Sequence, residues 1–168
     1  MIKKKIKLYY KNLVQLFFKR LYGNVLVPKN VHNLIKKEKI KNNKYKSFSN
    51  KYYNIYRIKD ARIYTDNNEN VAIIKNNFIL PQISFQQVKG NLKESRFNSV
   101  VKIGTPSFLK KIKGKVFNLC QGGSGNNYFH FIFDIIPKIH LLIYKKKLKD
   151  VDYFYLTNPK KWQIVILK

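Results

Sequence analysis

The chain of 168 residues has a single cysteine, Cys120, and only three histidines. One thiol cannot form an internal disulfide, so a disulfide-stapled secreted scaffold is excluded and a reducing compartment is favoured. The histidines and the cysteine do not have the spacing of a zinc site, and no metal or other cofactor is expected. Cys120 follows a short apolar segment, so we expect an inert thiol in the core rather than a nucleophile.

Acidic residues are also scarce, with 8 against 35 lysines and arginines, and the formal net charge is +27. Such a charge would ordinarily suggest a nucleic-acid partner. Only four of the basic residues are arginine, however, and arginine has the planar fork that base and phosphate recognition favours. The chain is also rich in Asn, Ile, Tyr and Phe, as A- and T-rich coding DNA produces. We therefore expect no specific nucleic-acid partner, although an attraction to anionic surfaces follows from the charge.

The N-terminal part has no apolar run long enough to span a bilayer, and no signal-peptide pattern. From Ile2 to Leu21 apolar residues recur every three or four positions between lysines, which predicts an amphipathic basic helix. Two interpretations of this helix stay open. Residues 1–22 could contact an anionic membrane surface peripherally, with Phe17 and Phe18 in the interface, or the helix could simply cap the domain.

The Lys- and Asn-rich residues 36–54 are expected to form a flexible, solvated linker, so that residues 1–54 make a basic arm. The chain then becomes β-like. Ala61–Tyr64 and Val71–Ile74, joined by a turn, read as a hairpin, and Asn76-Asn77 marks a second turn before Phe78.

The region after residue 115 reads as strand, glycine loop, long helix and strand. Val116–Cys120 is the first strand and Val151–Leu156 the second, with charged residues 145–150 between the helix and the second strand. This spacing is that of a βαβ unit with parallel strands. The expected fold class is α/β: a Rossmann-like βαβ layer preceded by a small β-meander and the basic N-terminal helix.

The helix opens with Asn127–Pro137, which holds one imidazole and one carboxylate among apolar side chains. His130 and Asp134 are four residues apart and share a helix face. The surrounding residues leave no polar face, so we expect this helix to be buried on most sides. A buried imidazole and carboxylate must be bonded to each other, to backbone or to a ligand. Pro137 has no N–H for the carbonyl of Phe133, which predicts an irregularity beside Asp134.

The loop before this helix, Gln121–Asn126, contains Gly123 and Gly125, and it follows the carboxyl end of a strand, where ligands usually sit in α/β sheets. Glycines allow close approach of the backbone to a ligand. The loop lacks the Lys-Ser/Thr of a P-loop, and Tyr128 stands where a dinucleotide fold has its third glycine. Structural roles are equally open: Asn127 could be a helix cap, Tyr128 a helix-start staple, and His130 a satisfied core histidine.

The segment C-Q-G-G-S-G-N-N-Y-F-H-F-I-F-D-I-I-P-K resembles the signature of glycosyltransferase family 61. The hairpin strands near residues 62–66 and 71–74 also resemble the hairpin that precedes that signature, and the resemblance covers roughly residues 55 to 168. The positions that carry it are Asn127, Tyr128, His130, Asp134, Pro137, Lys138 and the run Asp152–Tyr155.

The resemblance implies an enzyme that transfers a sugar from a nucleotide-sugar donor to a hydroxyl of a glycan or lipid-linked acceptor. Transfer would proceed with inversion and without a required metal, in surface polysaccharide or lipopolysaccharide biosynthesis at the cytoplasmic side of the membrane. His130 or Asp134 would be the catalytic base, and Gly123, Gly125, Asn127 and Tyr128 would bind substrate.

Residues 55–168 correspond to the N-terminal part of such a two-Rossmann-domain (B-type) transferase. No H-G-A-G-like motif occurs before Lys168, so the donor-binding C-terminal half is expected to be absent and the chain incomplete on its own. The alternative is a non-catalytic basic module that binds nucleic acid or an anionic membrane, with affinity that falls steeply with salt.

Overall fold

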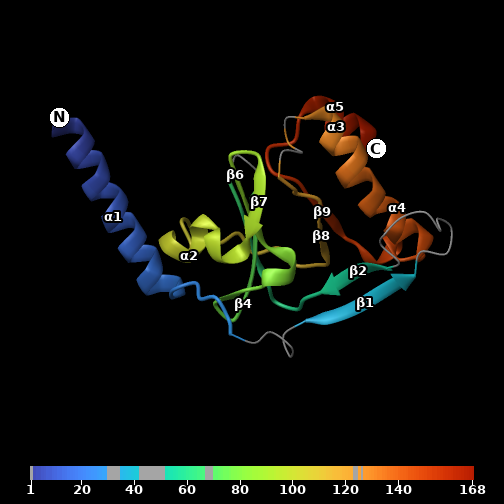
Figure 1. The fold of residues 1–168 in the computed structure, drawn as a ribbon, viewed down its shortest axis with the longest axis horizontal. Coiled ribbons are helices and arrows are strands. Elements are labelled where there is room, and N and C mark those ends of the chain that lie inside the picture. The colour runs from blue at the N-terminus through green and yellow to red at the C-terminus, as the bar shows by residue number, and fades with distance from the viewer. Residues whose placement is uncertain (1, 30–34, 42–51, 67–69, 123–124, 126) are drawn as a thin grey trace.

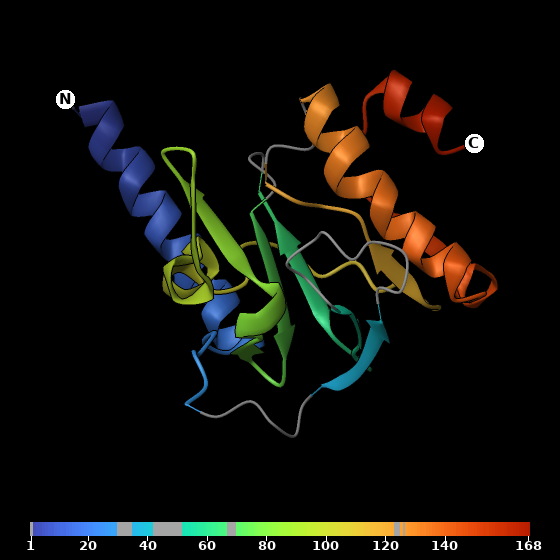
Figure 2. The same ribbon diagram turned by 45° about the vertical axis from the view of Figure 1, so that its right-hand side comes forward.

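The computed structural model describes residues 2–29, 35–41, 52–66, 70–122, 125 and 127–168. Helix α1 lies on one side of the molecule and helices α3, α4 and α5 lie on the opposite side, with the strands between them (Figures 1 and 2). The described strands form four small sheets.

Helix α1 (Ile2–Tyr22) confirms the N-terminal helix that the apolar spacing predicts. It extends away from the rest of the chain, and only its C-terminal end is packed, where the buried Phe18 stacks on Tyr22 with ring centroids 6.1 Å apart. Gly23 ends the helix with φ 78°, and a Cβ on it would lie 2.5 Å from Nδ2 of Asn77. Glycine is therefore required at this position by both conformation and space. No helix in the described part of the chain is long and apolar enough to cross a membrane.

The central sheet has the antiparallel order β3 (Arg62–Thr65), β4 (Val71–Lys75), β5 (Phe78–Ile79). This confirms the predicted hairpin, with Tyr64 opposite Ala72, and the second turn, where Asn76 and Asn77 both have positive φ as in a type I′ turn. After α1 the chain joins this sheet through a parallel bridge between Leu26 and Phe78.

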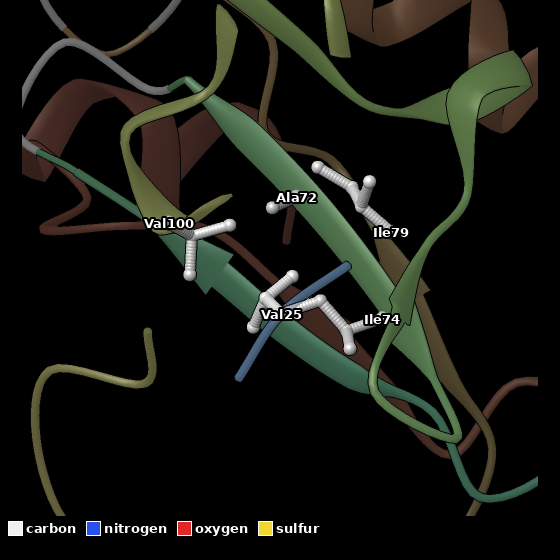
Figure 3. Close-up of a cluster of buried hydrophobic side chains, with 5 residues drawn as sticks. All are labelled: Val25, Ala72, Ile74, Ile79 and Val100. Atoms are coloured by element: carbon white, nitrogen blue, oxygen red, sulfur yellow. The ribbon is translucent and has the colours of Figure 1, made fainter. Parts of the chain in front are cut away.

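Strand β4 is buried on both faces. On one face the core cluster draws side chains from the segment after α1, from the sheet and from helix α2 (Figure 3): Val25, Ala72, Ile74, Ile79 and Val100. The other face packs against Leu80 and Cys120, and Cys120 is buried as its position predicts. The single cysteine thus connects the central sheet to the βαβ region.

A second hairpin, β6 (Phe85–Val88) and β7 (Asn91–Glu94), stands beside the central sheet, flanked by the short helices η1 (Pro81–Ile83), η2 (Ser95–Phe97) and α2 (Ser99–Ile103). The buried Asn98 joins these pieces. Its side chain accepts a hydrogen bond from the N–H of Val100 and donates to the carbonyls of Val71 and Phe85.

The expectation of a flexible linker over residues 36–54 is wrong wherever the structure describes that range. β1 (Lys36–Lys41) pairs antiparallel with β2 (Tyr52–Arg57), and Ile40 is buried at 1% exposure. The lysine-rich composition concealed the strand because one apolar side chain is enough to fix its inward face, while Lys36, Lys37 and Lys39 are exposed.

An ion pair holds this hairpin to the turn after helix α4. Lys147 donates a hydrogen bond to the carboxylate of Glu38, and this bond, with smaller contributions from nearby cations, holds the pKa of Glu38 below its usual value. A lowered carboxyl pKa means that the stabilisation is present at neutral pH and is lost as the pH falls through that pKa.

We expect Lys147→Gln to raise the pKa of Glu38 towards that of a free glutamate, about 4.3, because the charged donor is removed. The pKa can be followed by NMR titration of the Glu38 side-chain carboxyl carbon. Lys145→Gln is the matched control, because Lys145 acts on Glu38 through its charge alone and is the weakest of the three cations. Equal shifts in the two variants would contradict the assignment.

The predicted βαβ unit is present. β8 (Val116–Asn118) and β9 (Tyr153–Tyr155) pair in parallel as a two-stranded sheet. Between them runs one long helical segment, α3 (Tyr128–His130), η3 (Phe131–Ile135) and α4 (Ile136–Tyr144), followed by the short η4 (Leu148–Asp150). Helix α5 (Lys161–Ile166) closes the described chain. A third cluster, Leu119, Phe131 and Ile135, packs the helical segment onto this layer.

Candidate active site

The helical segment starts just beyond the carboxyl ends of the two parallel strands. There the N–H of Leu119 donates to the carbonyl of Tyr155 at 2.9 Å, and the backbone N–H of Thr157 approaches Sγ of Cys120 at 3.2 Å. These contacts fix the two strand ends side by side. Such an edge is where α/β sheets usually place a ligand.

Asn127 sets the start of the helix. Its backbone is extended, with φ −110° and ψ 113°, and its side-chain oxygen accepts a hydrogen bond from the N–H of His130 at 3.3 Å. The capping role that the sequence left open for Asn127 is thus confirmed. The cap also fixes the backbone of the histidine that the site depends on.

His130 and Asp134 are bonded to each other, with Nδ1 of the imidazole 2.9 Å from Oδ2 of the carboxylate. Because a carboxylate can only accept, Nδ1 carries the proton and Nε2 keeps its lone pair. Nε2 has no hydrogen-bond partner among the residues that the structure describes. The side chains are 44% and 33% exposed, so an external molecule can reach the pair.

Asp134 lies in a π turn that begins directly after His130. Residues Phe131–Ile135 form η3, in which the N–H of Ile136 donates to the carbonyl of Phe131, five residues back. Two residues later stands Pro137, which has no N–H to give. The irregularity that the proline predicts therefore takes the form of a π turn, and such turns occur frequently at functional sites.

The expectation that this helix is buried on most sides is wrong. Phe131 and Ile135 are fully buried, but Phe129 and Phe133 are 61% and 62% exposed. The two exposed rings lie 4.5 Å apart, and the ring of Phe129 meets His130 edge to face at 5.9 Å. The helix has a buried stripe and an open aromatic face, and the His–Asp pair borders the open face.

Trp162 is the residue whose place in the site the sequence did not reveal. It packs on Tyr128 at 5.2 Å and on Phe131 at 5.1 Å between ring centroids, and so joins α5 to the first turn of the helical segment. The ring of Tyr128 thus packs on another helix, which is not the contact of a helix-start staple, and its side chain remains largely exposed. The apolar spacing after Pro159 predicts a helix there but not the element it contacts.

The structure brings Asn127, His130 and Asp134 together, whereas Tyr128 packs on Trp162 of α5. Gly125 lies in a turn of the loop before them, and Gly123 lies outside the described residues. The described part of the chain has no group of three or more His, Cys, Asp or Glu side chains that could hold a metal ion.

No protein-family model, no curated protein and no solved structure matches this chain. The functional assignment therefore depends on the geometry of the site and on the motif around residues 121–138.

We expect wild-type His130 to be in the Nδ1–H tautomer and Asp134→Ala to shift it towards the Nε2–H tautomer that free neutral histidine prefers. The reason is that only the carboxylate holds the proton on Nδ1. The ¹⁵N shifts of the ring, measured at a pH where the imidazole is neutral, distinguish the two forms. The exposed His140 serves as the internal control. An unchanged tautomer in Asp134→Ala would show that the carboxylate does not orient the imidazole.

Proposed function

We propose that this chain is the acceptor-side part of an inverting glycosyltransferase that moves a sugar from a nucleotide-sugar donor to an acceptor hydroxyl. The single observation that carries the proposal is the reachable His130–Asp134 pair, with Nδ1 bonded to the carboxylate and Nε2 left to accept a proton.

In this reaction the acceptor hydroxyl oxygen attacks the anomeric carbon of the donor sugar. The bond from that carbon to the diphosphate oxygen breaks with its electron pair, and the hydroxyl proton passes to Nε2 of His130. Asp134 holds the imidazole in the correct tautomer and stabilises the imidazolium that forms. The geometry thus favours His130 as the base and Asp134 as its positioning residue.

The exposed aromatic face suits the acceptor. The rings of Phe129 and Phe133 present π faces beside the base, and the negative face of an aromatic ring attracts the weakly positive C–H groups of a sugar. An acceptor glycan lying on these rings would bring a hydroxyl to Nε2 of His130.

The resemblance places the nucleotide-sugar donor in a second Rossmann-like half. That half would have to stabilise the departing diphosphate with positive charge or helix N-termini. The βαβ unit formed by β8, the helical segment and β9 supports the view that the part of the chain after the β-meander is a Rossmann-like layer. In this proposal the transferase acts in surface polysaccharide or lipopolysaccharide assembly at the cytoplasmic side of a membrane.

The experiment is a turnover assay with a panel of nucleotide sugars and glycan acceptors, on the chain alone and on the chain joined to any continuation encoded beyond Lys168. Release of nucleoside diphosphate together with a glycoside of inverted anomeric configuration, read by NMR, supports the proposal. Release of free sugar without an acceptor product, or no turnover in either form across the panel, would contradict it.

A further inference from the structure

We propose that helix α1 and the segment Ser107–Lys115 together form one surface that binds an anionic lipid bilayer, with the helix lying in the plane of the interface. We call this set of residues the α1 surface. The proposal is independent of the transferase assignment.

The first observation is an apolar stripe on α1 that the described chain leaves uncovered. Ile6 and Leu13 are 63% and 47% exposed, and Tyr10 and Phe17 continue the same stripe at helical spacing. Helices of monomeric proteins normally bury such a stripe against their own core. Here only the last turns do so, and the interpretation that α1 merely caps the domain does not account for the first turns.

The second observation is that a distant segment extends the stripe. Phe108, which is largely exposed, meets Phe17 and Phe18 with ring centroids 6.2 and 5.1 Å away, and the N–H of Leu109 donates to the hydroxyl of Tyr22 at 3.2 Å. Ile112, four residues after Phe108 in the same segment, is 52% exposed. The residues around the resulting shallow apolar hollow are Tyr10, Leu13, Val14, Phe17, Phe18 and Phe108.

The charge around this apolar surface has one sign. Helix α1 carries seven lysines and arginines and no acid, and residues 107–115 carry four lysines and no acid. In α1 the lysines at positions 4, 11 and 19 occupy the side opposite the apolar stripe, and the other cations lie along its flanks. This arrangement is typical of helices that lie at a membrane surface with lysines on anionic headgroups.

The side chains of the apolar stripe favour a lipid bilayer over nucleic acid or a second copy of the chain as the partner. Single-stranded nucleic acid binds where aromatic rings and arginines line a groove. The α1 surface has aromatic rings, but Arg20 is its one arginine, and bases cannot stack on the aliphatic Ile6 and Leu13. A second copy of the chain would bring two lysine-flanked helices together, and their like charges would repel. In a bilayer with anionic headgroups, the apolar stripe can enter the interface while the lysines contact the headgroups.

The test is sedimentation of the full chain with vesicles of phosphatidylcholine mixed with phosphatidylglycerol, and with vesicles of phosphatidylcholine alone. We expect binding to the mixed vesicles. We also expect the double variant Ile6→Ser, Leu13→Ser to bind them at least about tenfold more weakly, because two apolar side chains no longer enter the interface. The net charge is unchanged, and neither residue is part of the buried core, so the fold is retained.

Leu92→Ser is the matched control, since Leu92 is a leucine of β7 that is exposed to a similar degree but lies outside the α1 surface. It should bind like the wild type. Equal binding by the double variant and the control would overturn the proposal, because binding would then follow overall charge alone. Binding to single-stranded RNA with no binding to the mixed vesicles would overturn it as well.

Discussion

Replacing Phe131 by alanine is expected to lower the free energy of unfolding by about 3–5 kcal/mol, the range for deleting a buried aromatic ring. Phe131 is fully buried, packs edge to face on Trp162 at 5.1 Å between centroids, and shares a cluster with Leu119 and Ile135. Its loss would leave a cavity where the helical segment meets both the parallel strands and α5.

Phe133→Ala is the matched control, two residues further along the same helix. Its ring is 62% exposed, so we expect a loss of less than about 1 kcal/mol, as for surface substitutions in general. Urea unfolding followed by the fluorescence of Trp162 and by circular dichroism gives both values, and Trp162 is the only tryptophan in the chain. If the two variants lose similar free energies of unfolding, then Phe131 is not on the buried face of this helix and Phe133 is not on the exposed one.

The difference in burial between Phe131 and Phe133 could not be predicted from the sequence. The segment from Tyr128 to Ile143 is apolar all round, so its composition predicts a helix buried on most sides. Which face is buried depends on the π turn, since one extra residue in a turn rotates everything that follows it. Pro137 indicates that an irregularity occurs, but neither its type nor its rotation can be read from the sequence.

Local patterns were sufficient where a short-range rule decides the structure. The spacing of apolar residues predicted α1, turn residues predicted the β3–β4–β5 meander, and strand-loop-helix-strand order predicted the parallel pair β8–β9. The β1–β2 hairpin was missed because its Lys- and Asn-rich composition favours a solvated segment, and its contact with Lys147 is distant in sequence. Tertiary contacts override a composition that by itself favours a solvated segment.

In the candidate site, too, one feature could be predicted from the sequence and another could not. The four-residue spacing predicts that His130 and Asp134 meet, and their 2.9 Å hydrogen bond confirms this. The sequence could not say which of the two is the base, because that depends on which nitrogen the carboxylate holds and on which side of the helix is open.

In the proposed transferase, His130→Ala is expected to reduce kcat by about 10²- to 10⁴-fold, the usual contribution of a general base, with little change in KM or in the unfolding midpoint. Nε2 is the ring nitrogen left to take the proton of the acceptor hydroxyl, because Nδ1 is bonded to Oδ2 of Asp134. His140→Ala, a change of the exposed histidine of α4, is the matched control and should turn over like the wild type.

The Asp134 variants decide the roles within the pair. If Asp134 positions the imidazole, Asp134→Asn should lose at least as much activity as Asp134→Ala, because the amide N–H can donate to Nδ1 and move the imidazole proton to Nε2, where the base must be free. Steady-state kinetics of the single variants and of the double variant His130→Ala, Asp134→Ala measure the coupling. Residues that act as one unit are non-additive, so the double variant should be no slower than His130→Ala alone. If His130→Ala keeps its turnover while Asp134→Ala abolishes it, the carboxylate is the base and the imidazole only orients it.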